Sequence, residues 1–110
     1  QRGHVTADLL FGAAAVYLMG GIAFGVAHHL VETLHPGSFV GLPDTAEPPQ
    51  MLYFSLVTLT TLGFGDVAPV FGPARALVVL EALFGQLYVA IMLARLVALQ
   101  VSATPGARGE

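Results

Sequence analysis

The sequence predicts an all-α membrane protein with two membrane-spanning helices and, between them, a short helix that enters the membrane and returns. Three observations lead to this fold class. Of the 110 residues, 55% are hydrophobic and 10% are charged, whereas soluble domains carry about a quarter charged residues. Two long apolar runs are separated by a shorter one. The shorter run leads directly into an irregular segment, residues 62–66, that contains two glycines.

The first span is predicted at residues 9–31. Residues 9–27 carry no charge and would form a helix about 28 Å long, which matches the hydrocarbon thickness of a bilayer. A cleaved signal peptide is the alternative, but the apolar part of such a peptide is usually about 7–15 residues long. Gly21 and Gly25 form a Gly-x-x-x-Gly pair, and small residues let helices approach closely in lipid. We therefore expect close helix packing along this span.

Residues 32–49 are expected to form an exposed loop, because they contain four prolines and two glycines. Three of the four histidines, His28, His29 and His35, lie at or near the start of this loop. Their spacing does not place them together as ligands on one helix face. We expect interfacial or solvated histidines rather than a metal site.

A short helix is expected at residues 50–61, where proline precedes an apolar segment without glycine or charge. About 12 residues give a helix of roughly 18 Å, which is too short to cross a bilayer. The irregular backbone that follows is tolerated inside a membrane only where protein encloses it or water lines it. One chain with two spans cannot enclose it, so we expect several copies to assemble.

Residues 62–66 have the composition of an ion selectivity filter. Backbone carbonyls can replace the water around a cation only if consecutive carbonyls face one way, which requires left-handed backbone angles at alternate residues. Gly63 and Gly65 stand at alternate positions, and Leu62 and Phe64 between them are expected to project backwards into packing. Thr61 adds a hydroxyl oxygen at the inner end. A tight turn between helices is the alternative; a phosphate-binding loop would need a further glycine or a Gly-Lys-Ser/Thr ending, which this segment lacks.

The segment Thr-Leu-Thr-Thr-Leu-Gly-Phe-Gly-Asp at residues 58–66 resembles the signature of potassium channel pores. The resemblance extends over residues 9–101 and implies a single pore domain with an outer helix, a turret loop, a pore helix at 50–61, a filter at 62–66 and an inner helix. It also implies a homotetramer that conducts K⁺ passively, with no cofactor other than the K⁺ ions in the filter. The residues it places around those ions are Thr61, Leu62, Gly63, Phe64 and Gly65.

Other functions remain open at this point. A nonselective cation channel that also passes Na⁺ would have nearly the same sequence, and a non-conducting two-span assembly subunit is a further alternative. Block by Ba²⁺ would support the channel. The sequence carries no lysine and no arginine cluster, so nucleic acid is not an expected partner, whereas membrane lipid is. No nucleotide motif indicates an enzyme or a pump, and what opens the pore is not indicated.

The resemblance also implies residues that support the filter. Tyr53 and Phe54 stand where aromatic residues of the family brace it from behind, and Thr60 and Asp66 flank it. Val57 replaces a glutamate that bonds the filter aspartate in some members, which should weaken the side-chain cage. Glu81 is a carboxylate within a span, and such residues are by default candidates for function. We expect it to hydrogen-bond to the back of the pore helix or filter; the alternative is a protonated or paired group between subunits.

The second span is predicted at residues 74–101, about 42 Å if fully helical, which allows tilt or an extension beyond the bilayer. Gly85 lies nineteen residues after Asp66, a spacing that resembles the hinge glycine of inner helices. A helix glycine marks either bending or close packing, and both remain open. The residues expected to line the cavity and inner gate are Gln86, Val89, Leu93 and Val97.

The distribution of charge predicts the topology. Arg2 precedes the first span, and Arg95 and Arg108 lie at or after the end of the second. Toward the loop side there is only Arg75, at the very start of the second span, whereas four of the seven acidic residues lie between the spans. By the positive-inside rule, both termini are expected in the cytoplasm of a multi-pass cell-membrane protein, with the filter loop entering from outside.

Overall fold

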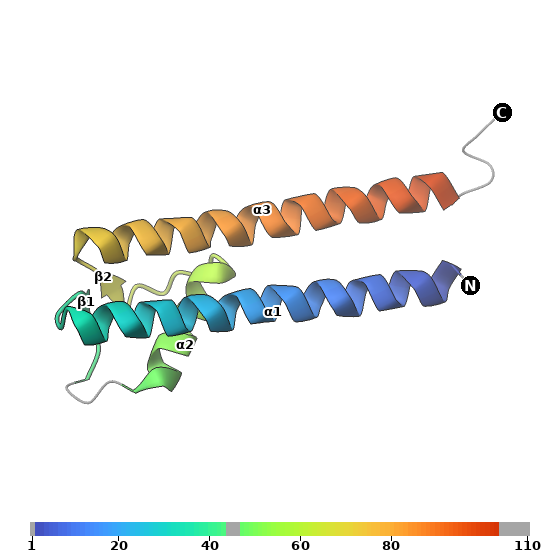
Figure 1. Ribbon diagram of the computed structural model, residues 1–110. Coiled ribbons are helices and arrows are strands. Elements are labelled where there is room, and N and C mark those ends of the chain that lie inside the picture. Colours follow the sequence, from blue (N-terminus) through green and yellow to red (C-terminus); the bar gives the residue numbers. More distant parts are fainter. Residues whose placement is uncertain (1, 44–46, 104–110) are drawn as a thin grey trace.

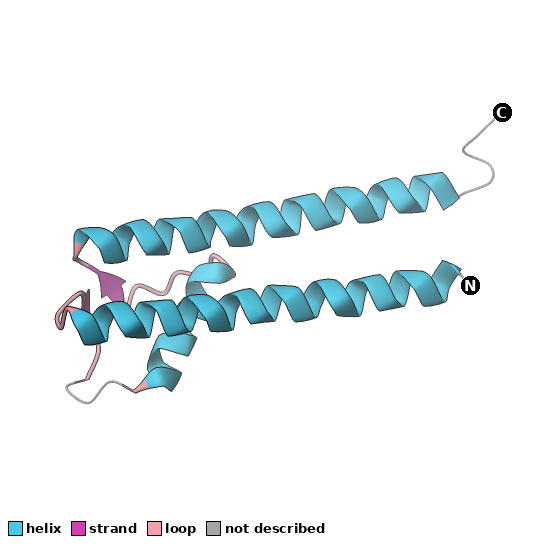
Figure 2. Cartoon of the chain, in the orientation of Figure 1, coloured by secondary structure: helices cyan, strands magenta, loops and turns pink. Residues whose placement is uncertain are grey.

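The computed structural model describes residues 2–43 and 47–103, in which it has three helices and two very short strands (Figures 1 and 2). In chain order these are α1 (Arg2–Leu34), β1 (Phe39–Val40), α2 (Pro48–Leu59), β2 (Ala68–Pro69) and α3 (Gly72–Ala103). The molecule is elongated, with extents of 63 × 22 × 20 Å. The predicted fold class is confirmed: two long apolar helices flank a short middle one. Arg108 and residues 44–46 of the expected turret loop lie outside the described residues.

The helices α1 and α3 run antiparallel, so the first residues of α1 and the last of α3 lie at the same end of the molecule (Figure 1). Both are long and apolar enough to cross a membrane, over Ala7–Leu34 and Gly72–Ser102. The structure extends α1 to Arg2 and α3 to Ala103, beyond the expected ranges 9–31 and 74–101. The expected ranges followed the apolar stretches, whereas helix hydrogen bonding continues through the polar residues that flank them.

The middle helix begins and ends two residues earlier than expected. Pro48 and Pro49 occupy its first turn, where a missing N–H costs nothing because the first N–H groups of a helix have no internal partner. The backbone N–H of Glu47 donates to Oε1 of Gln50 at 2.6 Å, which closes the start of the helix. At the other end, the positive φ of Thr61 takes the backbone out of the helical conformation.

The middle helix packs on α1, and the glycine pair makes this possible. A Cβ on Gly25 would lie 3.3 Å from Cα of Leu52, and one on Gly21 would lie 2.9 Å from the side chain of Leu56. The expectation of close packing at the Gly-x-x-x-Gly pair is therefore confirmed. The partner helix is α2 of the same chain.

A two-residue antiparallel pairing joins the loop after α1 to the segment before α3, with Phe39 opposite Pro69 and Val40 opposite Ala68. The carbonyl of Ser38 accepts further hydrogen bonds from the N–H groups of Val70 (2.8 Å) and Phe71. The sequence predicted only loop here, since two-residue strands leave no alternating pattern to detect.

The buried core is small and lies at the loop end of the molecule. It contains Phe39, Met51, Phe54, Val67 and Ala74. Along most of their length, by contrast, α1 and α3 expose large apolar side chains. Such surfaces suit contact with lipid or with further copies of the chain.

Candidate functional site: the loop after α2

The backbone of the loop after α2 alternates in handedness. Thr61, Gly63 and Gly65 have φ values of +60°, +60° and +81°, and Thr61 is the one non-glycine residue with positive φ among the described residues. This alternation is the backbone geometry that an ion filter needs, whereas ion binding itself stays a prediction. A left-handed non-glycine residue costs about 1–2 kcal/mol, and such strain is concentrated at functional sites.

Hydrogen bonds tie the loop to the last turn of α2. The carbonyl of Val57 accepts from the N–H groups of Leu62 (2.9 Å) and Gly63 (3.3 Å), and the N–H of Thr61 donates to the carbonyl of Thr58. The Thr60 hydroxyl donates to the Leu56 carbonyl at 2.7 Å. Val57 therefore holds the loop through its backbone carbonyl, a role that could not be predicted from its apolar side chain.

Asp66 is held by Tyr53. The phenol of Tyr53 donates to Oδ2 of Asp66 at 2.8 Å, and the N–H of Val67 donates to Oδ1 at 3.1 Å. The bond to Asp66 raises the pKa of the Tyr53 phenol above its ordinary value of 10.0. From the sequence, the expected position for a partner of Asp66 was that of Val57, and the bond from Tyr53 was not predicted. Tyr53 and Val57 are four residues apart and so lie on the same helix face.

Two expected packing arrangements can be compared with the single chain. Leu62 and Phe64 were expected to pack backwards, and in the single chain they are 58% and 64% exposed. No element of the described chain covers them, so their packing stays a prediction about contacts between copies. Phe54, expected to brace the filter, also packs its ring edge-to-face against His28 and Phe39, with ring centroids 5.2 and 5.3 Å apart. It thus links α2 to α1 and β1.

The loop, α2 and α3 together border a hollow of about 310 Å³. The loop residues Thr61, Gly63 and Gly65 line it on one side, together with Val78 and Ala82 of α3. The remaining lining residues are Phe54, Val57, Thr58, Val67 and Pro69. A space of this size behind the loop leaves room for side chains from outside the chain.

Gly85 lies against the end of α2. A Cβ at this position would overlap the carbonyl oxygen of Leu59 and lie 3.0 Å from its carbon. The same oxygen accepts a hydrogen bond from the phenol of Tyr17 at 3.1 Å. Close packing, one of the two explanations for this glycine, is therefore present; α3 runs through it without a break, and bending at Gly85 stays a prediction.

The residues expected to line a cavity share one face of α3. They are exposed in the chain, whereas Glu81 and Gly85 are buried against α1 and α2, and Val89, one turn after Gly85, lies at the border between the exposed and the buried face. The members of this face are Gln86, Val89, Leu93 and Val97. The face is therefore free to border a cavity, which the single chain does not close.

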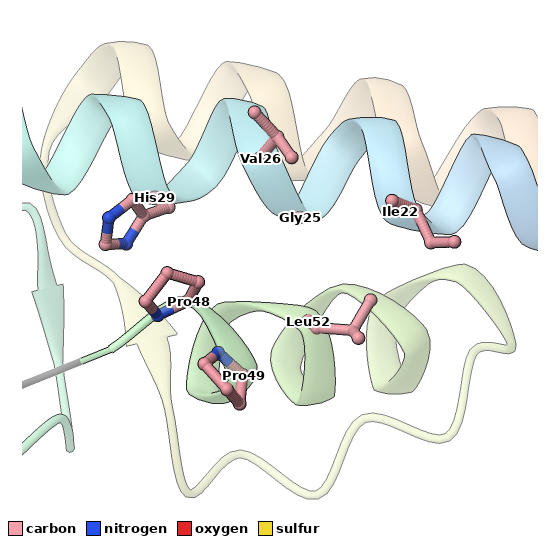
Figure 3. Close-up of a pocket in the computed structure, with 7 residues that line it drawn as sticks. All are labelled: Ile22, Gly25, Val26, His29, Pro48, Pro49 and Leu52. Carbon is pink, nitrogen blue, oxygen red and sulfur yellow. The ribbon is translucent and has the colours of Figure 1, made fainter.

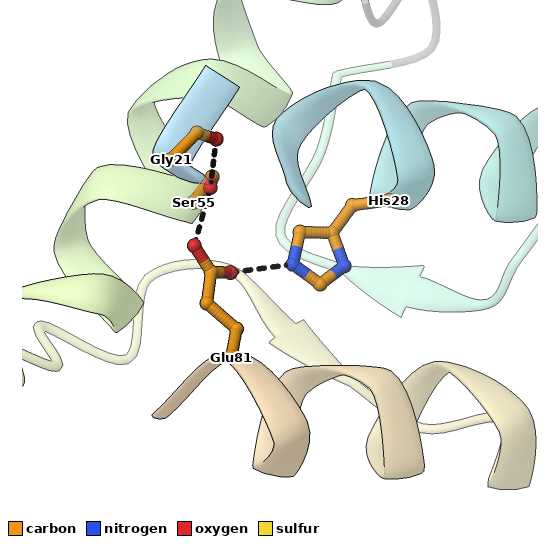
Figure 4. A network of polar contacts seen from close by, with 4 residues as sticks. All are labelled: Gly21, His28, Ser55 and Glu81. Carbon is orange, nitrogen blue, oxygen red and sulfur yellow. Dashed lines mark hydrogen bonds and ion pairs between the residues drawn. The ribbon is translucent and has the colours of Figure 1, made fainter. Parts of the chain in front are cut away.

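A buried polar cluster connects all three helices (Figure 4). Oε1 of Glu81 on α3 lies 2.7 Å from Nε2 of His28 on α1. Oε2 of the same carboxyl lies 2.5 Å from Oγ of Ser55 on α2, and this Oγ lies 2.6 Å from the carbonyl oxygen of Gly21 on α1. His28, Ser55 and Glu81 are all 0% exposed. The contact between Glu81 and the pore helix agrees with the sequence expectation, and its role in supporting a filter stays a prediction.

The expectation of interfacial or solvated histidines is wrong for His28, which is fully buried in that cluster. His35 stacks on Phe71, with ring centroids 3.7 Å apart and an interplanar angle of 3°. His29 borders an apolar groove of about 430 Å³ between α1 and the first turn of α2 (Figure 3). The rings that contact His28 and His35 lie far from them in the chain, so no local sequence pattern predicts these contacts. Within the part of the chain that the structure describes, no three His, Asp or Glu side chains gather as metal ligands.

Comparison with known proteins agrees with this geometry. The family described as "ion channel" matches residues 6–101. A relative, the inward rectifier potassium channel Kirbac3.1 of Paramagnetospirillum magnetotacticum, is 32% identical over 80 residues, covering 69% of this chain and 24% of the relative. The chain thus spans about a quarter of that relative's length. The resemblance to two-transmembrane potassium channel pores is confirmed, and the chain belongs to the ion channel family.

Proposed function

We propose that four copies of this chain form a potassium-selective pore in the cell membrane and conduct K⁺ passively. The observation that carries the proposal is the alternation of left-handed backbone at Thr61, Gly63 and Gly65. Carbonyl oxygens of a strand with alternating handedness can face one side, where they substitute for the hydration shell of a cation. The similarity to a potassium channel supports K⁺ as the ion.

Exposure of the loop supports assembly around a common axis. Residues 60–66 are all exposed, and the apolar side chains of Leu62 and Phe64 have no cover within the described chain. A loop at membrane depth has to be enclosed by protein or to line water. Neighbouring copies supply the enclosure, and the number four follows from the filters of the family, which consist of four such loops.

Electrostatics favours a cation at this position. The pore helix α2 carries no charged residue and ends at Leu59, so the partial negative charge of its C-terminus lies directly at the base of the loop. Four such ends converge on the axis in the proposed tetramer. At the other end of the loop, Asp66 adds a carboxylate whose orientation is set by Tyr53.

The conduction path continues along α3. Ions that leave the loop at Thr61 enter a cavity lined by the exposed face that contains Gln86 and Val89. The Gln86 amide offers hydrogen bonds to cavity water, and the apolar residues further along the same face narrow the path as an inner gate. Ions advance down their gradient by mutual displacement between adjacent sites.

The orientation in the membrane follows from the positive-inside rule. The beginning of α1 and the end of α3 share one end of the molecule (Figure 1), and Arg2 and Arg95 belong to the parts of these helices nearest that end. We place that end in the cytoplasm and the loop end outside. The acidic residues between the spans then face the side from which K⁺ enters the filter.

The test compares two glycine variants in liposomes. Gly63 and Gly37 both have positive φ, +60° and +88°, and a Cβ on either would meet no atom closer than 4.0 Å. Alanine therefore imposes a comparable backbone strain of about 1–2 kcal/mol at both sites. We expect Ba²⁺-sensitive K⁺ flux from the wild type and from Gly37→Ala, and its loss in Gly63→Ala.

Reversal potentials in opposed K⁺ and Na⁺ gradients test the selectivity. A reversal potential near the K⁺ equilibrium value supports the proposal, whereas one midway between the two ions indicates a nonselective cation channel. Flux that survives Gly63→Ala unchanged would refute the filter, and no flux from any protein would indicate a non-conducting membrane subunit.

A further inference from the structure

The short oxygen–oxygen contacts in the polar cluster between the three helices need more protons than the cluster would hold if Glu81 were a charged carboxylate. The Ser55 hydroxyl has one proton, yet its oxygen lies 2.5 Å from Oε2 of Glu81 and 2.6 Å from the carbonyl oxygen of Gly21 (Figure 4). Both distances are those of O–H···O hydrogen bonds. A peptide carbonyl cannot donate. One of the two bonds therefore needs a proton from elsewhere, and the carboxyl of Glu81 is the group that can carry it.

We propose that Glu81 is a neutral carboxylic acid, protonated on Oε2, at the centre of a directed hydrogen-bond chain that positions the pore helix. Nε2–H of His28 donates to Oε1 of Glu81, Oε2–H of Glu81 donates to Ser55, and the Ser55 hydroxyl donates to the Gly21 carbonyl. Every short contact in the cluster then holds one proton. The chain starts on α1, passes through α3 and α2, and returns to α1.

The alternative arrangement, a carboxylate paired with a protonated His28, leaves two defects. Oγ of Ser55 and the oxygen of Gly21 would face each other at 2.6 Å without a proton whenever the hydroxyl points at Glu81. The second N–H of an imidazolium would also be stranded, because Nδ1 of His28 is buried and has no hydrogen-bond partner among the described residues. An unpaired buried donor is costly, whereas a neutral ring carries no hydrogen on that nitrogen.

Within residues 2–43 and 47–103, the elements packed around Glu81 supply no charge that would stabilise a carboxylate in place of His28. Besides His28, α1 offers the phenol of Tyr17, which is bonded to Leu59, and α2 carries no titratable group between its first turn and its end except Tyr53 on its exposed side. Within α3, the arginines nearest in sequence are Arg75 and Arg95, six and fourteen residues away. A buried charge without compensation is strongly unfavourable, which favours the neutral acid.

The cluster controls where the pore helix sits. Ser55 lies one turn before Leu59, and the loop begins directly after that residue. The chain of hydrogen bonds thus fixes the base of the loop to both long helices. That Glu81 acts as a positioning residue for ion selection rests on the proposed channel function, whereas its protonation does not.

Infrared spectroscopy of the wild-type protein in liposomes at pH 7 tests the protonation directly. Labelling glutamate side chains with ¹³C separates a carboxylic acid C=O band from lipid ester bands. We expect such a band in the wild type and its loss in Glu81→Gln. The matched control is Glu32→Gln, because Glu32 accepts hydrogen bonds from the N–H groups of Gly37 (2.9 Å) and Phe39 (3.1 Å) and is acceptor-only in the structure. The Glu32 variant should keep the band.

Function and stability give a second, independent readout. The amide introduced by Glu81→Gln donates to Ser55 and accepts from His28 as the neutral acid does, so this variant should keep wild-type thermal stability and K⁺ selectivity. Glu81→Leu removes both bonds, and we expect a drop in thermal stability from this double loss. We also expect about a tenfold loss of K⁺ over Na⁺ preference from the loss of the bond to Ser55, which holds the base of the loop.

Absence of the acid band at pH 7, or severe destabilisation by Glu81→Gln, would overturn the proposal, since both follow from a carboxylate paired with imidazolium. Unchanged selectivity in a folded Glu81→Leu protein would overturn the positioning role. The band in a protein that never conducts supports the neutral acid while refuting the channel function, so the two failures are distinguishable.

Discussion

Replacement of Gly85 by alanine probes the close contact between α3 and the end of α2. A Cβ at Gly85 overlaps the carbonyl oxygen of Leu59, and restoring ordinary contact requires a separation of the two helices on the order of 1 Å. Overpacking of this kind costs about 1–3 kcal/mol. The movement also breaks the hydrogen bond from Tyr17 to the same oxygen, a further loss of about 1 kcal/mol.

The matched control is Gly12→Ala on α1, where an added Cβ meets nothing within 4 Å. Alanine in place of a helix glycine should stabilise by about 1 kcal/mol at either site. The expected net effects are therefore a gain of about 1 kcal/mol for Gly12→Ala and a loss of about 1–3 kcal/mol for Gly85→Ala. Gly21→Ala should be intermediate, because its Cβ would meet the end of a Leu56 side chain that can move.

The assay is thermal unfolding in detergent followed by circular dichroism, combined with K⁺ flux from liposomes. Gly85→Ala should melt below the wild type and conduct less, since Leu59 immediately precedes Thr60 and Thr61 at the base of the loop. If Gly85→Ala proved as stable as Gly12→Ala, the close contact would be refuted. Altered opening at unchanged stability would instead favour a hinge at this residue.

Three further predictions concern the loop and the cavity face. Tyr53→Phe removes the hydrogen bond to Asp66, so sustained K⁺ currents should decline faster than in the wild type; equal decline would exclude a supporting role. That bond raises the pKa of the Tyr53 phenol above 10.0, so its stabilising contribution is complete below pH 10.0 and is lost as the pH rises through the raised value. The current decay of the wild type should therefore approach that of Tyr53→Phe only in strongly alkaline solution. A difference between the two proteins that does not depend on pH would contradict this. The chain contains no cysteine, so a cationic thiol reagent should block Leu93→Cys channels and spare Ile91→Cys, a similarly exposed site about 160° away around α3; block of both or neither would remove the cavity assignment.

The helices and their order could be predicted because each has a local signal. Apolar length predicted the two spans, and the prolines before Met51 predicted the short helix between them. The ends of the helices were less accurate, since charge marks where a membrane ends and a helix continues until its hydrogen bonding is interrupted. The helix α2 ended earlier than composition suggested, because the backbone leaves the helical conformation at Thr61, whose φ is positive.

Partners of individual side chains were harder to predict. Glu81 was recognised as a candidate because a carboxylate within a span is costly, but nothing in the sequence connected it with His28, which lies 53 residues earlier. In the same way, Tyr53 was recognised as a brace without the bond to Asp66. Side-chain pairing depends on the angles and rotations at which helices pack, which the sequence pattern of each helix alone does not specify.

By itself, the sequence determined that this chain has membrane-length apolar helices and a glycine-containing loop able to alternate in handedness, because both properties belong to consecutive residues. Only the tertiary structure decided that Gly85 faces the Leu59 carbonyl and that Ser55, Glu81 and His28 share one buried site. These contacts join residues on different helices, and their geometry exists only once the helices have packed against one another.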